Sequence, residues 1–165
     1  MDVGALVLER VRLEDRAALE ALFDDYLREL ASHRDVAVGA TDARSHPYLP
    51  LYWAEPGRHP FFIVDEGRRS GFAMVREVPS EAVVQMAEFF LAPGVRRRGL
   101  GRQAVAEIWR RLPGDWQLQV HVRNEAGIAF WDRCVRASAR GEVRVYEVIE
   151  DDGRRLQFDF EIPAR

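Results

Sequence analysis

The sequence predicts an α/β fold in three layers, with a mixed sheet of about seven strands flanked by helices. Three observations predict it: one amphipathic helix near the N-terminus, a run of strand patterns after it, and then an alternation of helix and strand patterns that closes with a hairpin. The chain has 165 residues, of which 47% are hydrophobic, enough to bury one full core. We therefore expect a single domain over residues 1–165.

The first half of the chain begins with a strand pattern at Val3–Val11. Leu13–Ala31 then repeats apolar side chains at intervals of three and four, which is typical of an amphipathic helix. Histidines, glycines and prolines interrupt any longer element in Ser32–Pro60, apart from a short helix within Tyr48–Ala54. An antiparallel meander is expected next, with a turn before its second strand: Phe61–Val64, Gly71–Val78 and Val83–Leu91.

The second half alternates helix and strand patterns, so we expect parallel crossovers here. Leu100–Leu112 has a helical apolar face, and the alternation in Trp116–Val122 is typical of a half-buried strand. We expect Asn124 to be the N-cap of a helix that carries Ile128, Trp131 and either Cys134 or Val135 on one face. The turn signal Asp-Asp-Gly at 151–153 predicts a final hairpin between Val143–Val148 and Leu156–Phe160.

Composition limits the classes of partner. The net charge of −3 provides no bulk attraction for nucleic acid or an acidic membrane, and no segment has the length of a membrane span. No signal peptide is visible, and the single cysteine, Cys134, is most simply a small core residue without a disulfide. We therefore expect a cytoplasmic monomer or homodimer, with no nucleic-acid partner, no membrane partner and no metal site.

The most informative segment is Arg96–Arg102, where a strand leads through arginines and two spaced glycines into a helix. Gly99 and Gly101 allow close approach of the backbone, and the first turn of a helix offers unpaired N–H groups to an anion. A P-loop is excluded because the chain has no lysine. A dinucleotide-binding fold is disfavoured because the motif G-x-G-x-x-G is absent. The alternatives for the arginine run are a solvated charged surface or a nucleic-acid contact.

At R-x-x-G-x-G the sequence resembles the GNAT superfamily of acyl-CoA-dependent N-acyltransferases, whose pyrophosphate-binding turn reads [QR]-x-x-G-x-[GA] between a strand and a helix. A second block of the same family, N-x-x-[AG] followed by an aromatic residue, is matched by Asn124, Gly127 and Trp131. The two motifs occur in the family's order. The resemblance implies a sheet that is split between its fourth and fifth strands.

The resemblance also implies acetyl-CoA as co-substrate, and direct attack by an amine on its thioester in a ternary complex. The end of the fourth strand would contact the pantetheine arm, the turn and helix start would bind the pyrophosphate, and the second block would contact the rest of the arm. The implied residues are, in that order, Phe89, Phe90 and Leu91; Arg96, Arg97, Arg98, Gly99, Leu100, Gly101 and Arg102; and Asn124, Gly127 and Trp131.

Glu88 is the best candidate for the general base, because members of this family often carry a glutamate on the fourth strand. Its apolar neighbours would partly remove it from water; the alternative is an ordinary solvent-facing residue. His121, on the polar face of the next strand, is the second candidate, or a simple hydrogen-bonding residue. Trp131 stands where the family commonly has the tyrosine that protonates the departing thiolate, which an indole cannot do. Tyr146 is the only late tyrosine, and an acyl-CoA sensor without turnover is the alternative function.

The acceptor is expected to be a small-molecule amine or a protein amine. Acidic residues of the first helix and the following loop lie near aromatic residues in the sequence, a combination that suits a cationic amine: Asp24, Asp25, Glu29 and Glu55 with Tyr48, Tyr52 and Trp53. The alternative is a solvated helix face and a loop packed on the core. Polyamine, aminoglycoside-like, protein-amine and amino-acid acceptors all stay open.

Overall fold

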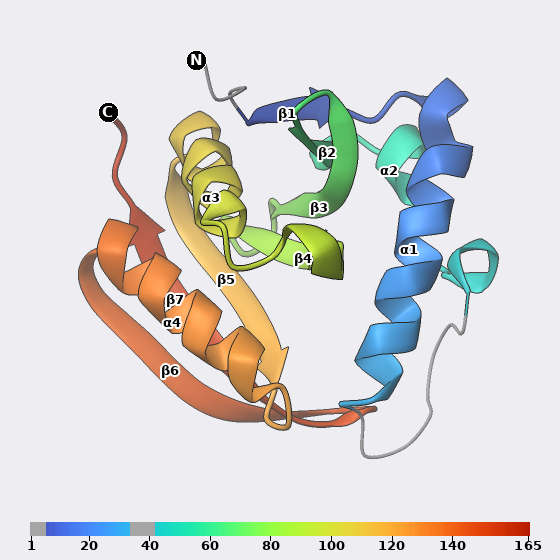
Figure 1. Ribbon diagram of the computed structural model, residues 1–165. Helices are drawn as coiled ribbons and strands as arrows, with labels where there is room; N and C mark the ends of the chain where they lie inside the picture. Colours follow the sequence, from blue (N-terminus) through green and yellow to red (C-terminus); the bar gives the residue numbers. More distant parts are fainter. Residues whose placement is uncertain (1–5, 34–41) are drawn as a thin grey trace.

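The protein is described by a computed structural model in which residues 6–33 and 42–165 are placed (Figure 1). These residues form one seven-stranded sheet in the order β1-β2-β3-β4-β5-β7-β6. The start of the predicted strand Val3–Val11 and part of the Ser32–Pro60 segment lie outside the described residues. The predicted mixed sheet with flanking helices is confirmed.

The strands are β1 (Val7–Arg10), β2 (Arg58–Asp65), β3 (Arg68–Val78), β4 (Val83–Leu91), β5 (Gly114–His121), β6 (Arg140–Glu150) and β7 (Gly153–Ile162). The α-helices are α1 (Arg16–Ala31), α2 (Leu51–Ala54), α3 (Leu100–Arg111) and α4 (Glu125–Ser138). Short 3-10 turns precede α1 and α3 and follow the undescribed segment: η1 (Leu13–Asp15), η3 (Pro93–Val95) and η2 (Ala43–Ser45).

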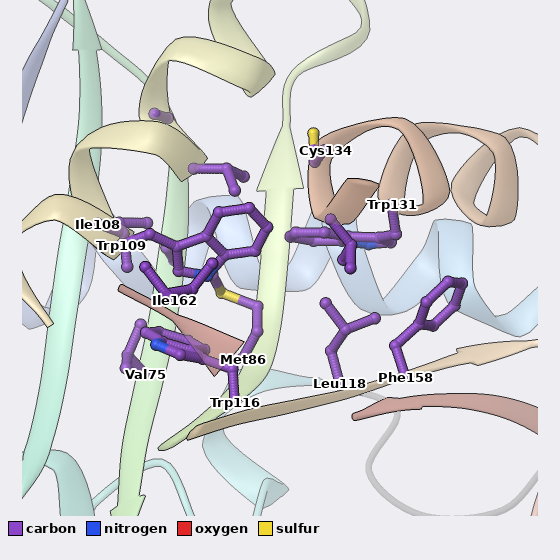
Figure 2. Close-up of a cluster of buried hydrophobic side chains, with 14 of the residues drawn as sticks. Val75, Met86, Ile108, Trp109, Trp116, Leu118, Trp131, Cys134, Phe158 and Ile162 are labelled. Carbon is purple, nitrogen blue, oxygen red and sulfur yellow. The ribbon is translucent and has the colours of Figure 1, made fainter. Parts of the chain in front are cut away.

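The sheet separates two layers of helices: α1 and α2 cover one face, and α3 and α4 cover the other (Figure 1). Each face has its own buried cluster. Trp109 of α3 and Trp131 of α4 pack with the sheet residues Trp116 and Phe158 on one side (Figure 2). Phe23 of α1 stacks on Phe72 of β3 on the other, with ring centroids 5.1 Å apart. The helices are therefore fixed to the sheet by large aromatic contacts.

The sheet is split between its two central strands. β4 and β5 are parallel, and they pair only where Val84–Met86 lies beside Trp116–Leu118. Past this point β4 continues to pair with β3 as far as Leu91, and β5 continues to pair with β7 as far as His121. The two strands therefore diverge toward their carboxyl ends, and each has an edge there that no described strand covers.

A β-bulge lies at the start of this divergence. In the β3–β4 ladder Met74 is opposite Glu88 while Val75 is opposite Met86, so Ala87 is the extra residue. Bulges re-aim side chains and are frequent beside active sites. The sequence pattern does not predict this one.

Several predicted boundaries shift. α1 begins at Arg16 because η1 occupies the first three positions of the predicted helix. β2 begins at Arg58 and includes Pro60, which the sequence pattern places in the loop; its carbonyl accepts a hydrogen bond from the Val11 N–H. Among the described strands only one parallel crossover forms, β4–α3–β5, because β7 lies antiparallel between β5 and β6. None of the helices in the described part of the chain is long and apolar enough to cross a membrane.

Candidate functional site

The segment between β4 and α3 presents a run of backbone donors. Gly99 is the N-cap of α3 with φ of 79°, and Arg97 also has a positive φ of 65°. The first α3 hydrogen bond runs from the Gln103 N–H to the Gly99 carbonyl at 3.1 Å. Within the described residues, the N–H groups from Arg97 to Arg102 have no hydrogen-bond acceptor. Such a run at a helix N-terminus is suited to bind phosphate groups.

The arginines of this segment divide into two kinds. Arg96 donates from Nε to the Leu91 carbonyl at 2.8 Å, and its Nη2 lies 2.6 Å from Glu29 Oε2 in α1. Arg98 reaches Asp65 at 3.4 Å. In contrast, Arg97 and Arg102 are exposed and have no ion pair within residues 6–33 and 42–165. Arg96 therefore holds the end of β4 against α1, and the exposed pair leaves its charge available to an anion.

Gly101 sets how closely α3 approaches α4. A Cβ placed there would lie 3.0 Å from Phe130 Cε2 and 3.2 Å from Leu91 Cδ1, tighter than most Cβ contacts, so these side chains would have to move. Gly101 is itself buried. The second glycine of the motif is therefore explained by packing, while the first is explained by backbone conformation.

The start of α4 is stabilised by its N-cap. Asn124 Oδ1 accepts a hydrogen bond from the Gly127 N–H at 3.0 Å. A Cβ on Gly127 would lie 2.4 Å from Asn124 Nδ2, so the small residue allows the cap to fold back over the helix. The predicted capping role of Asn124 is confirmed, and a contact of either residue with CoA stays a prediction.

The divergence of β4 and β5 opens a cavity of about 160 Å³. Its walls come from both strands, from α1 and the residues just after it, from α4 and its N-cap, and from β7 and the turn before it. The lining residues are Tyr26, Leu30, His33, Met86, Ala87, Glu88, Phe89, Leu118, Gln119, Val120, His121, Asn124, Trp131, Asp152 and Arg155. We call this cavity the gap. Of the residues predicted from the sequence, Glu88, Phe89, His121, Asn124 and Trp131 line it. Phe90 instead packs in the cluster under α1.

Glu88 lies at the junction of the gap and a second cavity on the α1 side of the sheet. The hydroxyl of Tyr26 donates a hydrogen bond to its Oε2, and His46 Nε2 lies 3.6 Å from Oε1. The carboxylate side chain is 23% exposed. Sequence reasoning missed both neighbours: Tyr26 falls on the apolar face of its helix, and His46 falls in a segment without periodicity.

His121 is only 7% exposed, and both its ring nitrogens contact backbone groups. The Arg123 N–H donates to Nδ1 at 3.1 Å, which leaves the proton on Nε2 to donate to the Asp152 carbonyl at 2.9 Å. The ring therefore connects the end of β5 to the β6–β7 turn. This geometry favours the hydrogen-bonding alternative, and a catalytic role for His121 stays a prediction.

Trp131 is 8% exposed and points from α4 into the buried cluster (Figure 2). Its ring meets Phe89 edge-on with centroids 5.2 Å apart. Tyr146, the other aromatic considered for protonating a thiolate, lies on β6, where its hydroxyl donates to Asp159 at 2.7 Å and accepts from Gln157. Tyr146 does not line the gap; among the described residues, the tyrosine that does is Tyr26.

The second cavity, of about 50 Å³, lies between β3, β4 and the segment that follows η2. Its lining residues are Phe23, His46, Tyr48, Leu49, Tyr52, Arg58, Met74, Arg76, Ala87 and Glu88. We call it the side pocket. Burial, followed by the negative charge of Glu88, raises the pKa of Tyr52 well above its usual value, so this hydroxyl stays protonated.

The acidic residues proposed to attract an amine do not line the side pocket. Asp25 pairs with Arg28, Glu29 with Arg96, and Glu55 with Arg58. Asp24 accepts a hydrogen bond from the Ala43 N–H at 2.7 Å. The predicted combination is therefore only half present, because Tyr48 and Tyr52 reach the pocket and the four carboxylates do not.

Comparison with known proteins supports this description of the fold. Comparison with curated protein sequences finds no significant match. Among solved structures, an acetyltransferase from Thermus thermophilus superposes with a TM-score of 0.70 at 18% identity, over 98% of this chain and 100% of that one. A chimera of the spermidine N-acetyltransferase SpeG from Vibrio cholerae and hSSAT gives a TM-score of 0.64 at 14% identity, over 95% of this chain and 94% of that one. Aminoglycoside acetyltransferase AAC(6')-Ib in complex with coenzyme A gives 0.68 at 16%, over 95% of both chains.

The model of the acetyltransferase (GNAT) family matches residues 17–134, which run from α1 through both motif blocks into α4 and cover more than half of the chain. The β4–β5 split, the donor run before α3 and the capped start of α4 all lie within the matched region. This chain belongs to the GNAT family of acetyltransferases.

Proposed function

We propose that the protein transfers the acetyl group of acetyl-CoA to a primary amine by direct attack in a ternary complex. The observation that carries this is the continuity of the site: the unpaired N–H groups of Arg97–Arg102, the uncovered edge of β4 and the carboxylate of Glu88 follow one another along the described chain. The residues fit CoA at its anionic end, since the donor run and the exposed arginines match a pyrophosphate. Acetyl-CoA supplies the activated thioester.

The protein's contribution is chiefly placement. Holding an amine and a thioester at attack distance lowers the barrier by roughly 7–11 kcal/mol in favourable cases. Glu88 would accept one proton from the substrate ammonium, and the resulting free amine would form its bond to the thioester carbonyl carbon. The carbon–sulfur bond would then break, and the departing CoA thiolate would take up, through water, the second proton that the nitrogen loses. Tyr26 is then a positioning residue, since its hydrogen bond fixes one oxygen of Glu88 and leaves the other toward the side pocket.

A second candidate function is an acyl-CoA sensor with little turnover. The observation that favours it is Trp131, which occupies the family's tyrosine position and packs in the core without an ionisable group. In this case acetyl-CoA would bind in the same place, and no amine would accelerate the release of CoA.

Thermal unfolding with and without acetyl-CoA tests the binding site. A ligand that binds only the native state stabilises it, so we expect the natural chain to gain stability and Gly99→Asp to gain little, because its carboxylate would lie among the phosphate donors. Gly67→Asp is the matched control: this glycine also has a positive φ, 76°, but it lies in the open β2–β3 turn. The control should lose similar intrinsic stability and keep the full response to acetyl-CoA.

Release of free thiol on addition of amines then separates the two functions. Amine-dependent release supports the transferase, and stabilisation without release for any amine supports the sensor. No stabilisation of the natural chain at saturating acetyl-CoA would contradict both.

A further inference from the structure

Two arginines face each other at the side pocket. In the β2–β3 ladder Arg58 lies directly opposite Arg76, so the two side chains leave the same face of the sheet. Both line the pocket. Like charges opposite each other in an antiparallel pair are destabilising, and the fold gains nothing from this arrangement by itself.

The two positive charges are not equally neutralised. Arg58 is buried, and its Nε lies 3.0 Å from Glu55 Oε2, on a side chain that is half exposed. Its guanidinium also lies over the Tyr52 ring, 5.2 Å from the centroid. Arg76 is partly buried, yet within the described residues its guanidinium has no hydrogen bond or ion pair. An uncompensated cation therefore remains at this pocket, next to the base.

The register also sets the spacing between this cation and Glu88. Glu88 is opposite Met74, and Arg76 follows Met74 by two residues on the same face of β3, a step of roughly 7 Å along the strand. Both charges also act on the Tyr52 hydroxyl in the same pocket: burial and the charge of Glu88 raise its pKa, and Arg58 and then Arg76 oppose the rise. The pocket therefore pairs a carboxylate at one end with an arginine at the other.

We propose that the acceptor is a small aminocarboxylate, an amino acid whose ammonium group meets Glu88 and whose carboxylate meets Arg76. This inference rests on the proposed function and narrows its substrate. A free amino acid has the two charges at the spacing of a few bonds, and the small volume of the pocket suits a short molecule. A polyamine or an aminoglycoside carries several cations and no carboxylate, so it would leave the charge of Arg76 unneutralised and add repulsion.

The test compares amino acids with their carboxamides as acceptors, with free thiol as the readout. For the preferred amino acid we expect kcat/KM at least tenfold above that of its carboxamide. Arg76→Gln should remove most of that preference, chiefly through KM, while Arg76→Lys should keep part of it because the charge remains. Arg68→Gln is the matched control, since it removes the same charge from an exposed position at the other end of β3.

Stability provides a second readout. Because Arg76 and Arg58 repel each other, the Tm of Arg76→Gln should equal or exceed that of the natural chain. A loss of activity in this variant would then not reflect a loss of folding. Equal turnover of acids and amides, turnover of polyamines alone, or acetyl-CoA binding without turnover of any panel member would overturn this inference. A natural chain that fails to bind acetyl-CoA would instead overturn the proposed function.

Discussion

Tyr26 and Glu88 lie 62 positions apart in the chain and are joined by a hydrogen bond from the tyrosine hydroxyl to the carboxylate. The contact connects α1 to β4, next to the bulge at Ala87. Glu88 is thereby directed to the boundary between the gap and the side pocket. An ordinary strand residue on a regular ladder would not be held in this position.

Tyr26→Phe should reduce kcat/KM by roughly tenfold, because a hydrogen bond to a charged group that orients the base is lost. Stabilisation by acetyl-CoA should hardly change, since the phosphate donors lie elsewhere. In the background of Glu88→Gln the same substitution should have little further effect, because the two residues act as one unit. Steady-state kinetics of the single and double variants measure this.

Tyr146→Phe is the control for that experiment. The Tyr146 hydroxyl also donates a hydrogen bond to a carboxylate, that of Asp159, but Tyr146 lies on β6 and does not line the gap. Its kinetics should match those of the natural chain. A loss in Tyr146→Phe equal to that in Tyr26→Phe would contradict the role assigned to Tyr26.

Gly101→Val should destabilise the protein by about 1–3 kcal/mol, because its side chain would overlap Phe130 and Leu91. The resulting shift of α3 should also weaken acetyl-CoA binding. Ala106→Val, on the exposed face of the same helix, controls for the helix propensity of valine and should cost less than about 1 kcal/mol. Chemical denaturation of both variants gives the comparison, and equal losses would show that the close packing at Gly101 is unimportant.

Cys134 should react slowly with a thiol reagent in the native protein, because burial raises the pKa of its thiol to about 11. Since that pKa lies above the assay range, the native rate should rise about tenfold per pH unit from about pH 7 to 9, while the rate of a free thiol levels off near its own pKa of about 8.5. Labelling of the single cysteine should reach completion quickly only after unfolding. Fast native labelling at neutral pH would contradict the burial of this side chain.

Local patterns were sufficient for the order of elements. The apolar spacing of Leu13–Ala31 predicts α1, and that of Leu100–Leu112 predicts α3. The glycine spacing predicts the turn before α3. These signals depend on neighbours in sequence, which is why they could be read directly. The roles of the two glycines needed the structure, since one depends on φ and the other on Phe130.

What the sequence could not predict depends on register. The bulge at Ala87 has no signature in the apolar pattern of β4, and the opposition of Arg58 and Arg76 follows only from how β2 aligns with β3. The acidic residues expected to attract an amine are near aromatic residues in sequence, but each is engaged by an arginine or a backbone N–H, and none of the four lines the side pocket. The sequence pattern thus predicts several carboxylates at the acceptor site, whereas the charged residues that line the side pocket include Arg58, Arg76 and Glu88.

The short pairing of β4 with β5 also has a mechanical consequence. Strands β1–β4 form one antiparallel unit and β5–β7 another, and the only ladder between these units in the described part of the chain joins Val84–Met86 to Trp116–Leu118. Relative rotation of the two units would disturb few hydrogen bonds, so amide exchange along this seam should be faster than within either unit. A molecule lying between them would contact both units and restrict that rotation, so that occupancy of the site would be measurable as rigidity far from the bound atoms.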